Sequence, residues 1–582
     1  MTVDRTGGFR APLERRALLR RTALSALGAA SCAPSDALGA STAHLAVAVV
    51  ANRRAMATLP DPSAGDIVFL AEAGREGHFI CRAGRWSASA DPLQGVSAPA
   101  SGAFHYARLW DGTHGRPEWF GAVPDDPAVE CADAIEACYA LCPVTQLAQA
   151  DYLIRRTLHF NRSWRTVQGA GRYARERGQG TRIILHRDAP GLHTDDILLV
   201  GSIDRPPAGT GAGEGERLLC QNQIGGFTLV RDGPCAPHPS RDLVRYPTGL
   251  RVSYVFHCHL RDIASLESSV GFYVGGAVYT KFDDCLAQRT LPGTSAAGDF
   301  AVGYYLNGHI DFGYAGGNAS LYINRCVAAD QHPAHVAPAG LRGVGAFVDT
   351  FLDQFESARI DTGIAFAVDG ARGAGQTIDL HIRSPVCDGC AKYGIDLDLD
   401  AASSALVEIV DPYIAWAGRA SDRGILVHDG AGLVTITGGQ VIGDFTGGSL
   451  WFSRTRGVTV QGTKVQQASH PIVVTEASGL HLAPQINNYA TTSPAFAITC
   501  RALSRSIVRP TIIGADGPSF AGGISLGAET NHCGIDGSAI DPGCFNTVDA
   551  RNKVWFDGAD ARSGAAGARF TGAGNVLTGV TG

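Results

Sequence analysis

The stretch Gly394-Ile-Asp-Leu-Asp shows the pattern that decides the fold of this chain. The same order of glycine, apolar, any, apolar and any residue returns as Gly424-Ile-Leu-Val-His. Apolar residues at every second position have the period of a β-strand, so each copy predicts one short strand. Further copies begin at Gly249, Gly271, Gly303, Gly345, Gly363 and Gly523, and copies without the glycine begin at Ser449, Pro471 and Ala495.

A second strand, interrupted by a turn, follows each copy. From Pro385 onward these turns recur in steps of 22 to 27 residues, at Pro412, Gly438, Gly462, Pro484, Pro510 and Gly537. Two series of strands with one common period predict a parallel β-solenoid, in which each coil buries its apolar residues by stacking on its neighbours. The fold class that we expect is therefore all-β.

Composition agrees with a solenoid. The chain has 582 residues, of which 73 are glycine, and interior glycines disfavour a mainly helical protein. The hydrophobic share of 45% excludes wholesale disorder, and a net charge of −6 offers no basic field for nucleic acid.

Residues 117–186 resemble the entry to the pectate-lyase-type right-handed parallel β-helix superfamily, which includes phage tailspikes and polysaccharide depolymerases. The resemblance rests on Glu118-Trp-Phe-Gly-Ala, a helix from Cys131 to Leu141, Asp151-Tyr-Leu-Ile and Thr166-Val-Gln-Gly-Ala-Gly-Arg. It implies a right-handed β-helix whose open end is capped by that helix. One departure is Leu147-Ala-Gln-Ala, where the family usually has a Leu-Pro-Ala-Gly-type turn. The family varies its catalytic residues freely, so the resemblance carries none to this chain.

We expect three parts in the chain: an export signal and linker at 1–45, a small β module at 55–115, and the β-helix at 117–582. Paired Arg15-Arg16 before a short apolar run resembles a twin-arginine export signal, and Cys32 is a candidate for lipid attachment. No later apolar run is long enough to span a membrane. The protein is therefore expected to be exported, to the periplasm, the cell surface or the medium.

Stacked coils align the outward residues of the repeat in columns. The first expected column contains Arg251, Tyr273, Tyr305, Phe347, Asp396 and Trp451, and the second contains Asn307, Asp349, Asp398 and His428. Rings cover the apolar faces of sugars, while carboxylates hold hydroxyl groups and supply an acid and a base. This face therefore predicts a polysaccharide-binding groove. The expected substrate contacts are Arg251, Tyr273, Tyr305, Asn307, Phe347 and Trp451.

The expected catalytic residues are Asp349, Asp396, Asp398 and His428. Asp396 and Asp398 are two residues apart on one strand, about 6.6 Å between Cα atoms, and Asp349 is expected two coils from Asp398, about 9.6 Å away. Two carboxyl groups about 6.5–9.5 Å apart suit an inverting glycosidase. His428 would orient either acid. Solvated acids, a structural cation or a subunit contact remain alternative explanations of the same residues.

A rival group contains Asp262, Asp283, Asp284, His309 and Lys281. Its order resembles the polygalacturonase pattern, but Arg261-Asp262 replaces the usual Asn-Thr-Asp, and no Arg-x-Lys follows His309. A purely structural explanation is that Asp283 lies in a turn while Cys285 and Cys326 stack inside the coil.

Two further functions stay open. A polysaccharide lyase acting on a uronate glycan would use Lys281 beside Asp283 and Asp284, or Ca²⁺ at Asp396, Asp398 and Asp400. A non-catalytic glycan-binding rod or adhesin would need neither a catalytic lysine nor a bound Ca²⁺ ion. Hydrolysis requires no cofactor, no zinc-ligand pattern is found, and a homotrimer is an open possibility.

Overall fold

The structure is a computed structural model, and it describes residues 47–172, 179–203, 218–233, 246–289, 302–308, 318–330, 339–368, 378–399, 405–415, 422–488, 496–514, 522–527 and 529–536, with four short strands beyond them. The expected export segment with Cys32 lies outside the described residues, as do His309 and Asp400. No helix in the described part of the chain is long and apolar enough to cross a membrane.

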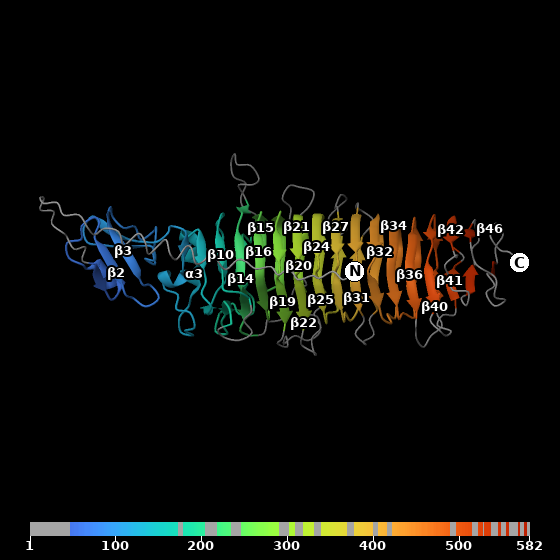
Figure 1. The fold of residues 1–582 in the computed structure, drawn as a ribbon, viewed down its shortest axis with the longest axis horizontal. Coiled ribbons are helices and arrows are strands. Elements are labelled where there is room, and N and C mark those ends of the chain that lie inside the picture. The colour runs from blue at the N-terminus through green and yellow to red at the C-terminus, as the bar shows by residue number, and fades with distance from the viewer. Residues whose placement is uncertain are drawn as a thin grey trace, which may run out of the picture. The chain divides into compact units, whose positions relative to one another are not determined.

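The predicted fold is confirmed: the described residues from 114 onward form a right-handed parallel β-helix, whose strands pair in parallel with those of the next coil (Figure 1). Each coil contributes strands to three faces, which we call A, B and C in chain order. Face A contains the predicted repeat. Its strands are β9 (Leu158–Phe160), β12 (Leu198–Gly201), β15 (Thr248–Phe256), β17 (Val270–Val278), β20 (Val302–Gly308), β23 (Ala339–Gly345), β26 (Thr362–Ala367), β29 (Tyr393–Asp398), β35 (Ile472–Ser478), β37 (Phe496–Cys500), β41 (Gly522–Leu526), β43 (Phe545–Val548) and β45 (Arg569–Phe570).

Face B follows face A in each coil. Its strands are β6 (His114–Gly115), β7 (Val144–Gln146), β10 (Thr166–Gln168), β18 (Lys281–Asp283), β21 (Asn318–Asn324), β24 (Phe347–Asp353), β27 (Ile378–Arg383), β30 (Ala405–Val410), β39 (Ile507–Val508), β42 (Cys533–Asp536), β44 (Val554–Asp557) and β46 (Val576–Thr578). Face C closes the coil with β8 (Asp151–Ile154), β11 (Arg182–Leu185), β19 (Leu286–Arg289), β22 (Val327–Asp330), β25 (Glu356–Ala358), β28 (Val386–Asp388), β31 (Tyr413–Ala415), β33 (Gln440–Ile442) and β40 (Thr511–Gly514).

Some strands continue round a corner. β14 (Gln223–Arg231), β16 (His259–Leu266) and β36 (His481–Asn488) belong to faces B and C, β32 (Arg423–Thr437) belongs to A and B, and β34 (Gly448–Gln466) belongs to all three. Two short strands, β13 (Leu219–Cys220) and β38 (Leu503–Ser504), pair with the ends of β15 and β35.

Where a face A strand begins with glycine, as at Gly363 and Gly394, close packing requires it. A Cβ atom on Gly394 would lie 2.5 Å from Cγ2 of Ile414 inside the coil and 2.6 Å from the carbonyl oxygen of Gly424 in the next coil. A Cβ on Gly363 would meet the Gly394 oxygen at 2.5 Å in the same way. Several turns before face C instead use left-handed residues that are not glycine, such as Asp284, Arg325 and Asp411, whereas the turns at Gly438 and Gly462 use left-handed glycine.

The predicted helix is also confirmed, as α3 (Ala132–Leu141). It buries Ile135 and Cys138, and the ring of Tyr139 stacks on Phe160 of β9 with centroids 4.4 Å apart. Cys285 and Cys326 lie buried in successive coils, as expected. The helix therefore covers apolar residues at the entry to the coil.

Residues before the β-helix form a separate five-stranded sheet. Its strands lie in the order β1 (Ala48–Val50), β2 (Ile67–Leu70), β3 (Gly77–Ala83), β5 (Phe104–Arg108) and β4 (Ser97–Pro99). A short helix, α2 (Arg53–Ala57), packs beside it, and a 3₁₀ turn, η1 (Pro117–Phe120), leads into the β-helix. This sheet has its own apolar core around Met56, Leu70 and Phe79.

Candidate functional site

The outward columns of face A follow the register of the parallel strands. Arg251 pairs with Tyr273, Tyr273 with Tyr305, and further along Asp396 precedes Leu426 and Trp451 in the same column. In the second column Asn307, Asp398 and His428 occupy the expected places. The predicted face therefore exists, and most of its predicted members belong to it.

Two predicted members were placed wrongly. Arg342 stands where Phe347 was expected, and Val344 stands where Asp349 was expected. The strand that belongs to face A is Gly340-Leu-Arg-Gly-Val, and its inward Gly343 leaves the space that the ring of Phe366 fills. Gly343 stands where the repeat pattern has an apolar residue, so the true face A strand was not recognised in the sequence. The next stretch, which begins at Gly345, has the residue pattern of the repeat although it does not form a face A strand. Phe347 instead begins β24 and is buried.

Asp349 lies on face B, in a left-handed conformation with φ of 51°. It faces Asp379, and burial together with the nearby Asp349 raises the pKa of Asp379, although the electrostatic effect of His381 opposes that rise. His381 stacks on Phe351, which stacks on Tyr322. Asp349 therefore cannot form the expected pair with Asp398.

The expected aromatic surface at the N-terminal end of face A is covered. Tyr273 and Tyr305 point outward from the sheet, but only 1% and 6% of their surfaces are exposed, in an apolar cluster that includes Tyr246. Arg251 is buried as well, forms an ion pair with Asp196, and lies 4.2 Å above the Tyr273 ring. The expectation that these rings lie open to a long glycan is therefore wrong.

Arg251 and Tyr273 line a cavity of about 540 Å³ together with Asn307, whose amide donates a hydrogen bond to the Tyr273 hydroxyl over 2.8 Å. Trp451, at the other end of the column, is half-buried beneath the guanidinium of Arg423, 4.1 Å from its ring. Both ends of the predicted column thus hold arginine–aromatic contacts.

The middle of the face brings three predicted residues together. His428 in β32 donates Nε2–H to Oδ1 of Asp396 over 3.0 Å, and its Nδ1 lies 3.9 Å from Oδ1 of Asp398. The same Nδ1–H donates over 2.8 Å to Oδ2 of Asp429, a residue that the sequence pattern missed. Asp398 is the most open of the group, with 40% of its side chain exposed.

The charges of this group depend on one another. The hydrogen bond to Asp396 is the main cause that raises the pKa of His428 to about 9, against the opposing effect of burial. Burial acts to raise the pKa of Asp429, but the hydrogen bond from His428 and the guanidinium of Arg454 outweigh it, and the pKa is lowered. At neutral pH His428 is therefore an imidazolium held between carboxylates.

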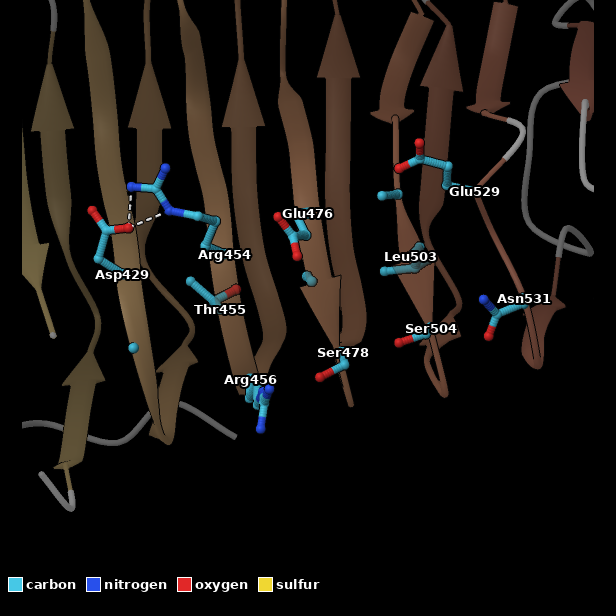
Figure 2. Close-up of a pocket in the computed structure, with 13 residues that line it drawn as sticks. Asp429, Arg454, Thr455, Arg456, Glu476, Ser478, Leu503, Ser504, Glu529 and Asn531 are labelled. Atoms are coloured by element: carbon cyan, nitrogen blue, oxygen red, sulfur yellow. Dashed lines mark hydrogen bonds and ion pairs between the residues drawn. The ribbon is translucent and has the colours of Figure 1, made fainter. Parts of the chain in front are cut away.

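A polar groove of about 680 Å³ begins at Asp429 (Figure 2). Figure 2 shows Asp429 paired with Arg454 at one end and Glu529 with Asn531 at the other, with Glu476 between them. Ser478 pairs with Ser504, and Ser504 bridges to Asn531, so these three polar residues lie in successive coils along the groove. Of the residues around His428, Asp429 lines this groove, so the group borders one end of a groove several coils long.

Glu476 was missed because the register shifts. Ser453 of β34 pairs with Glu476 of β35, where regular alternation would place Thr475. Asp429 was missed because it lies in a left-handed corner, with φ of 55°, inside a strand that continues from face A to face B. Its position directly after His428 is a signal that could have been used.

The rival acids also come together, in a cavity of about 530 Å³ on face B. Asp283 accepts hydrogen bonds from His259, over 2.6 Å, and from Asn324, over 2.7 Å. Asp262 pairs with Arg172 at 3.2 Å. Hydrogen bonds from Arg325 lower the pKa of Asp284. All three acids are therefore paired, mainly with arginine or histidine.

Lys281 does not line this cavity. Its ammonium lies 5.4 Å above the ring of Tyr322 in the next coil. His309, the remaining member of the predicted rival group, lies outside the described residues.

One group of residues has the spacing of metal ligands. One ligand atom from each of Asp398, His428 and Asp429 lies within 4.8 Å of the others. Two carboxylates and an imidazole suit a divalent cation, which would compete with the proton of His428 for its Nδ1 atom. The same residues could therefore hold either a proton or a metal ion.

No family model matches the chain, and no curated protein matches it. Several solved structures are similar to it, each with a TM-score below 0.5. The Streptococcus pneumoniae surface protein and adhesin PfbA is 9% identical, with a TM-score of 0.41, over 80% of this chain and 100% of that one. The tailspike protein of Escherichia coli bacteriophage HK620, solved with a pentasaccharide, is 12% identical over 78% of each chain, with a TM-score of 0.47. The gp42 tailspike of Acinetobacter phage vb_AbaP_AS12 is 12% identical over 89% of this chain and 77% of that one, with a TM-score of 0.38.

Proposed function

We propose that this protein is a carbohydrate-active enzyme that hydrolyses glycosidic bonds of a polysaccharide lying along face A. The observation that carries the proposal is the meeting of Asp396, Asp398, His428 and Asp429 at the head of a polar groove. A chain-like substrate fits a groove that extends over successive coils, whose hydroxyl and amide groups can bind sugar hydroxyls.

In this mechanism Asp396 and Asp398 are the catalytic pair. Their Cα atoms are about 6.6 Å apart on one strand, a spacing that suits an inverting pair. Because His428 contacts both carboxyl groups, the water molecule and the sugar must lie on the open side of this pair. Asp396, which accepts the hydrogen bond from the imidazolium, is assigned as the base that activates water. Asp398, the more exposed carboxyl group, is assigned as the acid; it protonates the leaving oxygen in the fraction of molecules in which the Asp398 carboxyl group itself carries a proton. His428 is a positioning residue, and hydrolysis needs no cofactor.

The experiment is digestion of a panel of neutral, amino and acidic polysaccharides by the full chain, with new reducing ends as the readout. Asp398→Asn and Asp396→Asn should each lower the rate at least about a hundredfold, the usual contribution of a positioned acid or base. Asp388→Asn, on exposed face C, is the matched control and should keep full activity. Cleavage that survives both face A substitutions would contradict the assignment.

Elimination is a second candidate, supported by a different observation. On face B, His259 is held by Asp283 at the edge of a cavity that also contains the exposed Arg261. A histidine base and an arginine beside a uronate carboxylate are the groups that a lyase requires. An unsaturated product seen by ultraviolet absorbance, and lost in His259→Asn, would favour elimination. Binding without any cleavage would favour the adhesin alternative. Export, lipid attachment at Cys32 and a homotrimer remain predictions.

A further inference from the structure

The groove that begins at Asp429 is lined by more carboxylates than cations. Its described acids are Asp429, Glu476 and Glu529, against Arg454 and Arg456. The ion pair with Asp429 uses the guanidinium of Arg454, so Arg456 is the remaining cation. The proposed catalytic residues next to the groove bring two more acids, Asp396 and Asp398, and one more cation, the imidazolium of His428.

Two of the acids are available to a ligand. Glu476 and Glu529 are both exposed, and neither has a hydrogen bond or ion pair among the residues that the structure describes. Figure 2 shows Glu476 in the middle of the row of lining residues and Glu529 with Asn531 at the end away from Asp429. Carboxylates held in a concave site reinforce one another's field, so the groove attracts cations and repels anions.

The groove also contains an unsatisfied polar group in its wall. Thr455 lines the groove and is only 3% exposed, and its hydroxyl has no hydrogen-bond partner among the described residues. A buried hydroxyl without a partner costs free energy, which a bound polar ligand can recover. The site is therefore a concavity with both unpaired carboxylates and an unsatisfied hydroxyl.

We propose that the groove selects an amino glycan, a sugar chain that carries protonated amino groups, over glycans that carry uronates. Glu476 and Glu529 are the specificity-determining residues, since each can pair with an ammonium group of a bound chain. A uronate in the same place would set like charges opposite each other. This inference rests on the proposed function of the groove, but it concerns the charge of the ligand and is tested by binding alone.

The test uses two probes with the same sugar backbone and length: an oligomer of glucosamine, kept below the pKa of its amines, and its N-acetylated form, in which an acetyl group removes each positive charge. Calorimetry on the full chain carrying Asp398→Asn, to prevent cleavage, should give about fivefold tighter binding of the glucosamine oligomer, because an exposed ion pair contributes modestly. Added salt should reduce the difference. An oligogalacturonate should bind more weakly than either probe.

Glu476→Gln and Glu529→Gln together should remove the difference between the two probes, whereas Glu356→Gln, an exposed glutamate of face C, should not change it. Circular dichroism checks that each variant folds. Equal affinities, tighter binding of the acetylated probe, or failure of both to bind would overturn the inference.

The proposed hydrolysis is judged separately, from cleavage by the unmodified chain. Preference for the amino probe without cleavage by the unmodified chain contradicts the hydrolysis only. Cleavage without the preference contradicts the inference only.

Discussion

His428 is the residue on which the candidate site depends, because it contacts three carboxylates: Asp396 and Asp398 of the neighbouring strand β29, and Asp429, the next residue of its own strand. Its raised pKa, about 9 against an ordinary value of 6.5, has a consequence for stability. A group whose pKa is higher in the folded than in the unfolded state stabilises the folded protein. This stabilisation is complete below the unfolded-state pKa and is lost as the pH rises through the folded-state pKa. The loss is therefore expected between pH 6.5 and about pH 9.

We predict that NMR titration of His428 gives a midpoint near pH 9. Asp396→Asn should lower this midpoint by at least about one unit, since the hydrogen bond to Asp396 is the largest cause of the shift. Asp388→Asn should leave it unchanged. A midpoint near 6.5 in the unmodified protein would show that the imidazole is not held between carboxylates.

The residue scale also shows where a pattern misleads. Asp349 and Phe347 follow a glycine in a stretch that imitates the repeat, yet both belong to face B. Asp349 lies next to Asp379 there, and Nε2 of His381 lies 3.3 Å from Oδ1 of Asp379. A substitution of Asp349 should therefore affect this face B group and leave the midpoint of His428 unchanged.

At the scale of the strand, the glycine column of face A limits what the repeat tolerates. Gly394 has no room for a Cβ atom, because Ile414 and the backbone of the next coil lie within 2.6 Å of its position. Gly462, in a corner with φ of 67°, has nothing within 4 Å. The two glycines are therefore required for different reasons, close packing and backbone conformation.

We expect Gly394→Ala to lower the free energy of unfolding by about 3 kcal/mol, through overpacking of strand on strand. Gly462→Ala should cost about 1–2 kcal/mol, the price of a left-handed alanine. Urea unfolding followed by circular dichroism measures both. Equal effects, or a neutral Gly394→Ala, would contradict the packing argument.

At the scale of the whole molecule, stacked coils leave an apolar end that must be covered. Helix α3 covers the first coils with Ile135, Cys138 and Tyr139, all buried. Since each coil is stabilised chiefly by its neighbours, losing the cover should expose the interior of the coils next to it.

Ile135→Asp should therefore promote aggregation and lower stability by about 4 kcal/mol, because a buried apolar side chain is replaced by an unpaired charge. Size-exclusion chromatography with light scattering and thermal unfolding measure the two effects. Asp133→Asn, on the exposed side of the same helix, is the control and should remain soluble and stable. A soluble, equally stable Ile135→Asp would show that the helix is dispensable as a cap.

Much of the architecture could be predicted from local patterns in the sequence. Period-two alternation and the recurring turns were sufficient to predict a parallel β-solenoid, and the resemblance of residues 117–186 to a known superfamily added the right-handed coil and the capping helix at Ala132–Leu141. The inward cysteines Cys285 and Cys326 and the meeting of Asp398 with His428 followed from the same repeat. These features depend on residues close in sequence and on one stacking rule, and that is why they could be predicted from the sequence by itself.

Only the tertiary structure decided which side chains share a site. The shift at Ser453 brings Glu476 into the groove, the inward Gly343 sets the register that excludes Asp349, and packing around Tyr246 covers Tyr273 and Tyr305. Register between coils depends on bulges and on the number of residues in each connection, and exposure depends on segments distant in sequence. Neither the register between coils nor the exposure of a side chain can be predicted from the alternation of apolar residues in a single strand.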